Sequence, residues 1–121
     1  MEGKQLNYIR TNEIYDFIQK QKLPVLVYIK GREPNEIARF NHTNIMLLSD
    51  EVQFQDKVIF ATVRSMPEEL TQAENGYEDT LNPKILALWW QGEEIASRRE
   101  LDAAISANLA EWLAVQLKKT E

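Results

Sequence analysis

Five apolar runs along this chain have the length and residue types of β-strands. Residues 25–29 form a continuous β-branched run, which predicts a strand buried on both faces at the centre of a sheet. Gln91 and Gly92 predict a tight turn that joins the last two runs into a hairpin. The predicted strands are residues 6–9, 25–29, 57–63, 84–90 and 94–98.

Helical periodicity separates these runs. Ile14, Phe17 and Ile18 recur at three- and four-residue spacing, so they predict one buried face of a helix that Thr11 or Asn12 caps. For the last helix, the cap is Ser97 (in a capping box with Glu100), Asp102 or Ser106. The predicted helices are residues 11–21, a region from 34 or 35 to about 48 with a restart to about 55, residues 67–73, and a last helix through Leu109 and Leu113.

The three tryptophans are candidates for the hydrophobic core or for an exposed contact surface. Trp89 and Trp90 are adjacent in a predicted strand, so their side chains point to opposite faces of the sheet. One of them fills the core, and the other is either core or an exposed contact surface. Trp112 lies on the apolar stripe of the last helix and is expected in the core.

Composition narrows the classes of function. The 121 residues carry a net charge of −5, which argues against binding to nucleic acid or to an anionic membrane. The sequence has no cysteine, which removes the commonest zinc sites, and its single histidine, His42, makes a histidine-rich metal site impossible. No cofactor is expected. With no linker and no spanning or signal segment, we expect one domain over residues 1–121 in the cytoplasm.

The order of these elements resembles the thioredoxin-like fold. Four segments carry the resemblance: the central strand in 23–29, the next strand in 57–63, Asn82-Pro83-Lys84 with the strand that follows, and the Gln91-Gly92-Glu93 turn. The resemblance implies an α/β three-layer sandwich, with a central mixed sheet in the order β-α-β-α-β-α-β-β-α and helices on both faces. It also makes Pro83 the family's cis-proline.

The departures from the family lie in the redox residues. The family's Cys-Gly-Pro-Cys motif falls on Pro34, Asn35, Glu36 and Ile37, and its buried aspartate falls on Tyr28. A proline has no nucleophile to replace the first cysteine, and an isoleucine cannot resolve a mixed disulfide. The sequence therefore predicts a redox-inactive protein with no catalytic residue.

The expected function is contact with a protein partner, as an adaptor, assembly factor or chaperone-like protein. The resemblance implies a partner-binding groove that is charged and polar. Its candidate residues are Arg32, Glu33, Pro34, Asn35, Glu36, Asn82, Pro83 and Lys84. Two alternatives remain: a glutathione-binding enzyme with Tyr28 or Ser65 in the key role, and a self-assembling protein, such as a homodimer, with Trp89 or Trp90 at the interface.

Overall fold

The computed structural model describes residues 6–30, 36–67, 84–99 and 109–120. The strands are β1 (Leu6–Tyr8), β2 (Val25–Ile29), β3 (Ile59–Val63), β4 (Lys84–Trp90) and β5 (Glu93–Arg99). The helices are α1 (Ile14–Lys20), α2 (Glu36–Ser49) and α4 (Leu109–Lys118), with 3₁₀ turns η1 (Thr11–Glu13) and η2 (Val52–Phe54). None of the helices in these ranges is long and apolar enough to cross a membrane.

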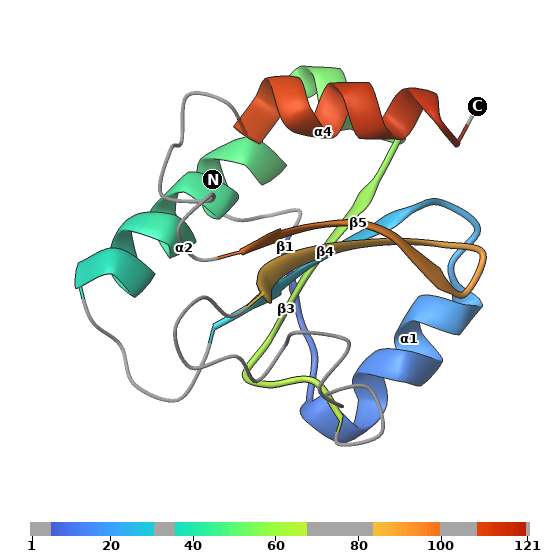
Figure 1. The fold of residues 1–121 in the computed structure, drawn as a ribbon, viewed down its shortest axis with the longest axis horizontal. Helices are drawn as coiled ribbons and strands as arrows, with labels where there is room; N and C mark the ends of the chain where they lie inside the picture. Colours follow the sequence, from blue (N-terminus) through green and yellow to red (C-terminus); the bar gives the residue numbers. More distant parts are fainter. Residues whose placement is uncertain (1–5, 31–35, 68–83, 100–108, 121) are drawn as a thin grey trace.

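The five strands form one mixed sheet in the order β1-β3-β2-β4-β5 (Figure 1). β3 is parallel to both β1 and β2, whereas β4 is antiparallel to both β2 and β5. All five residues of β2 are buried, because this strand lies between two others and is covered on both faces. The prediction of a central strand at 25–29 is therefore confirmed.

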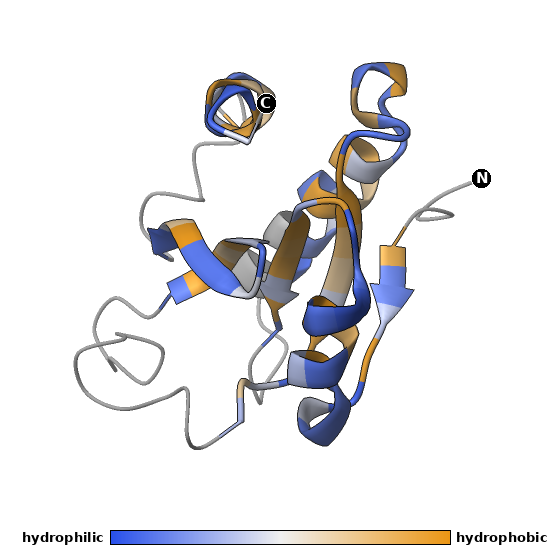
Figure 2. Cartoon of the chain, turned by 90° about the vertical axis from the view of Figure 1, so that its right-hand side faces the viewer, coloured by the Kyte–Doolittle hydropathy of each residue, from blue (hydrophilic) through white to orange (hydrophobic). Residues whose placement is uncertain are grey.

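Helices cover both faces of the sheet, which gives three layers. α2 and α4 lie on one face and α1 lies on the other (Figure 1). The cluster on the α2/α4 face includes Leu26, Phe60, Leu88 and Leu113, whereas the cluster on the α1 face includes Ile14, Ile18, Val27, Ala87 and Trp89. Figure 2 shows the central strands coloured mainly as hydrophobic, whereas the helices beside them carry both hydrophobic and hydrophilic residues. The architecture is the predicted α/β sandwich with a mixed sheet.

The hairpin between β4 and β5 turns at Gln91 and Gly92, as predicted. Both residues have positive φ, 53° and 83°, as a type I′ turn requires. A Cβ atom on Gly92 would lie 2.9 Å from Nε2 of Gln19, at the end of α1. The turn therefore favours glycine for its backbone angle, whereas the end of the exposed Gln19 side chain could move aside for a Cβ atom.

Some predicted details are wrong. No side chain caps η1 or α1: Arg10 and Glu13 occupy their N-cap positions, and the hydroxyl of Thr11 lies 3.3 Å from that of Ser65 instead. The predicted restart after Ser49 is the single turn η2 rather than a continued α-helix. Ser97 lies within β5 opposite Ala87, so it is not the cap of the last helix. Asp102, Ser106 and most of the predicted helix at 67–73 lie outside the described residues.

Candidate functional site

Two of the candidate groove residues lie in the described part of the chain. Glu36 is the first residue of α2, and Lys84 is the first residue of β4. The other six, Arg32, Glu33, Pro34, Asn35, Asn82 and Pro83, lie outside it, as does the peptide bond predicted to be cis. Tyr28 pairs with Leu86 in the antiparallel ladder, so the end of β2 and the start of β4 lie at the same edge of the sheet. The two segments that carry the candidate residues therefore leave the sheet from one edge.

Lys84 makes an ion pair within the fold. Its Nζ lies 2.7 Å from Oε2 of Glu94 on β5, and the two side chains are 10% and 23% exposed. A short charge-assisted hydrogen bond of this kind fixes both side chains. Lys84 therefore joins the start of β4 to the hairpin, and its ammonium group is mostly buried at the edge where the groove was predicted.

Tyr28 is part of the hydrophobic core. It is 2% exposed, its ring centroid lies 6.0 Å from that of His42 on α2, and its carbonyl accepts a 3.0 Å hydrogen bond from Thr62 Oγ1. Tyr28, on which the resemblance predicts the family's aspartate position to fall, is therefore a buried aromatic side chain. Because it is so buried, Tyr28 does not present its hydroxyl to a glutathione thiol, and Ser65 is half-buried beside Thr11.

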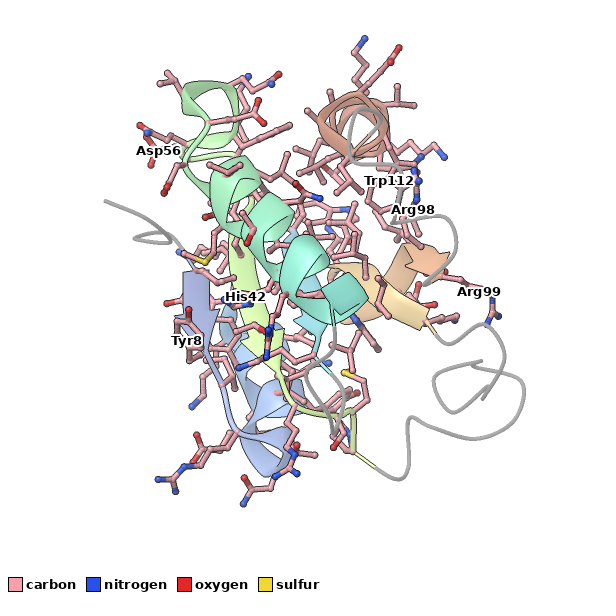
Figure 3. All side chains as sticks on the ribbon, turned by 90° about the vertical axis from the view of Figure 1, so that its left-hand side faces the viewer. Tyr8, His42, Asp56, Arg98, Arg99 and Trp112 are labelled. Atoms are coloured by element: carbon pink, nitrogen blue, oxygen red, sulfur yellow. The ribbon has the colours of Figure 1, made fainter. Side chains whose placement is uncertain are left out.

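His42 lies where α2 packs on the sheet, on the same side of the molecule as Tyr8 (Figure 3). Its Nδ1 is buried and has no hydrogen-bond partner among the described residues. Burial and, as a second cause, the positive charge of Lys30 hold the pKa of His42 below its usual value of 6.5. The neutral imidazole is therefore the form that the folded protein favours.

We expect His42 to make the protein less stable in mild acid. The unfolded chain binds the proton more tightly than the folded one, so stability is present above pH 6.5 and is lost as pH falls below it toward the lower folded pKa. Urea unfolding at pH 7.5 and 5.5 measures this loss, and the variant His42→Gln should show a smaller one. Equal losses in both proteins would contradict the expectation.

The tryptophans have three different environments. Trp89 is 6% exposed and packs in the cluster on the α1 face, so it is the core member of its pair, whereas Trp90 is half-buried. Trp112 is half-buried against the α2/α4 cluster, and the guanidinium carbon of Arg98 lies 5.5 Å from its ring centroid. A dimer interface built on Trp89 is not compatible with this burial.

Three cations at the same edge of the sheet were not singled out as a group in the sequence. Lys30 follows β2, Arg64 follows β3, and Arg10 lies two residues after β1. The available signal was a basic residue just beyond each of three predicted strands. Their juxtaposition depends on the strand order β1-β3-β2, which the sequence pattern did not provide.

The described residues contain no group of three His, Asp or Glu side chains that could hold a metal ion. No protein-family model and no curated protein matches the sequence. Among solved structures, the chain is similar to the crystal structure of thioredoxin f2 from Chlamydomonas reinhardtii. The TM-score is 0.52 at 14% sequence identity, and the match covers 89% of this chain and 98% of that one. The chain therefore has a thioredoxin-like fold, and its sequence contains no cysteine with which to carry out dithiol chemistry.

Proposed function

We propose that this chain acts by binding a protein partner, as an adaptor, assembly factor or chaperone-like protein, and that it is not an enzyme. The observation that carries the proposal is a thioredoxin-like fold that contains no cysteine. Catalysis by the resembled family needs a thiolate, which a helix N-terminus stabilises. Here the motif positions are Pro34 to Ile37, so the scaffold is available for recognition alone.

We place the proposed groove at the end of the sheet where β2 ends and β4 begins. The chain leaves β2 at Ile29 and enters α2 at Glu36, while it enters β4 at Lys84. The intervening candidate residues, 32–35, 82 and 83, then belong to segments that start from neighbouring strands. A charged surface at this edge would select its partner through electrostatic complementarity.

Affinity capture from the native host tests the proposal. The triple variant P34A/N35A/E36A should lose the partners that the unaltered chain captures. The matched control E111A/K118A/K119A changes three exposed residues of the α4 region and should retain them. Recovery of the same partners by both variants would mean that the groove is not the binding surface.

A further inference from the structure

Three basic residues lie side by side just beyond the C-terminal ends of β1, β3 and β2: Arg10, Arg64 and Lys30. Tyr8 pairs with Thr62, and Ile29 pairs with Val63, so the continued register sets Arg10 and Lys30 on either side of Arg64. Hydrogen bonds of 2.9 Å from the Ile9 amide to the Thr62 carbonyl and from the Lys30 amide to the Val63 carbonyl maintain this register beyond the strand ends. We call these three residues the cation row.

The row also has a defined face. Leu6 packs in the cluster on the α2/α4 face, so Tyr8, two residues further along β1, is on that side. The Nζ of Lys30 lies 5.8 Å from the centroid of the Tyr8 ring, which places Lys30 there too. The backbone of Arg10 is extended, with φ −76° and ψ 149°, so alternation also directs its side chain to this face. Arg10 and Lys30 therefore border the exposed ring of Tyr8, on the α2/α4 face of the sheet.

Within the described residues, these cations are not neutralised by an ion pair. All three side chains are exposed. Lys84, by contrast, forms an ion pair with Glu94. Neighbouring strands are about 4.8 Å apart. The whole row therefore lies within roughly one or two Debye lengths, which are about 8 Å each at physiological ionic strength. In a chain of net charge −5, such a row concentrates positive potential on one edge.

We propose that the cation row, together with Tyr8, binds an acidic segment of the partner protein. Arginine and tyrosine are the residue types enriched at the energetic centres of protein interfaces. Tyr8 is 62% exposed, so it offers an apolar surface beside the charges. Lys30 directly precedes the 31–35 segment in the sequence. The inference rests on the proposed function only in that the ligand is a protein.

A titration followed by amide NMR shifts tests this assignment on the full chain. The probe is a synthetic peptide in which glutamate alternates with glycine, and its counterpart carries glutamine instead of glutamate. The glutamate peptide should shift the amides of Arg10, Lys30 and Arg64, and the glutamine peptide should not. The variant R10Q/K30Q/R64Q should weaken binding by about tenfold, since each exposed charge pair contributes modestly.

The matched control is K20Q/K22Q/K57Q. Its three lysines are exposed and precede β2 and β3, at the opposite edge of the sheet, and it changes the net charge by the same amount. Binding in this control should remain within about twofold of that in the unaltered chain, because the removed charges are distant from the row. Equal weakening in both variants, or no binding of the glutamate peptide, would overturn the proposal.

Two further probes separate the partner class, and host capture separates this inference from the proposed function. A single-stranded oligonucleotide or an anionic phospholipid vesicle that binds through the row, where the glutamate peptide does not, would also overturn the proposal.

If R10Q/K30Q/R64Q still captures every host partner while P34A/N35A/E36A loses them, the inference fails and the proposed function stands. If only the cation-row variant loses them, the groove at 34–36 fails and the row stands.

Discussion

Replacing Phe60 with alanine is expected to lower the free energy of unfolding by about 4 kcal/mol, a large share of the stability of a domain this size. Phe60 is 2% exposed and lies on β3, opposite Leu6 of β1 and Leu26 of β2. Its ring meets that of Phe54 edge to face, with centroids 6.3 Å apart. The substitution removes this contact and opens a cavity between the sheet and η2.

Urea unfolding measures the effect, and two further variants control it. Phe60→Leu keeps most of the buried volume and should cost about 1 kcal/mol. Val52→Ala changes a residue of η2 that is 79% exposed, so its effect should remain below about 0.5 kcal/mol. A Phe60→Ala variant as stable as Val52→Ala would show that β3 does not pack against η2 as described.

Besides the α/β sandwich, which the order of the elements predicted, the sequence predicted local features that a single segment specifies by itself. The uninterrupted run at 25–29 predicted burial on both faces, and Gln91-Gly92 predicted a tight hairpin turn; both are confirmed. The predicted cap at Thr11 failed because its hydroxyl meets Ser65, 54 residues away, and no local pattern reports that contact. Long-range contacts of this kind override local propensity.

In the candidate site, too, the sequence predicted a residue but not its long-range contact. Lys84 was predicted as a groove residue from its position after Pro83, but its ion pair depends on the path of the hairpin. The ladder between β4 and β5 is irregular between Lys84 and Leu86 and again between Leu88 and Trp89. Such irregularities change which face a side chain occupies. The pairing of Lys84 with Glu94 therefore required the three-dimensional structure.

Replacing Lys84 with methionine should lower the free energy of unfolding by about 3 kcal/mol, because it removes one charge of a short, mostly buried ion pair while the carboxylate of Glu94 stays in place. The double variant Lys84→Met with Glu94→Met removes both charges and should recover most of this loss, which urea unfolding measures at neutral pH. Failure of the double variant to recover would mean that the ion pair is not the source of the cost. Because the double variant folds without the Lys84 charge, it also separates stability from recognition in host capture. If it retains every partner, Lys84 serves the proposed groove by anchoring β4 to the hairpin; if it loses them, the ammonium group itself contributes to binding.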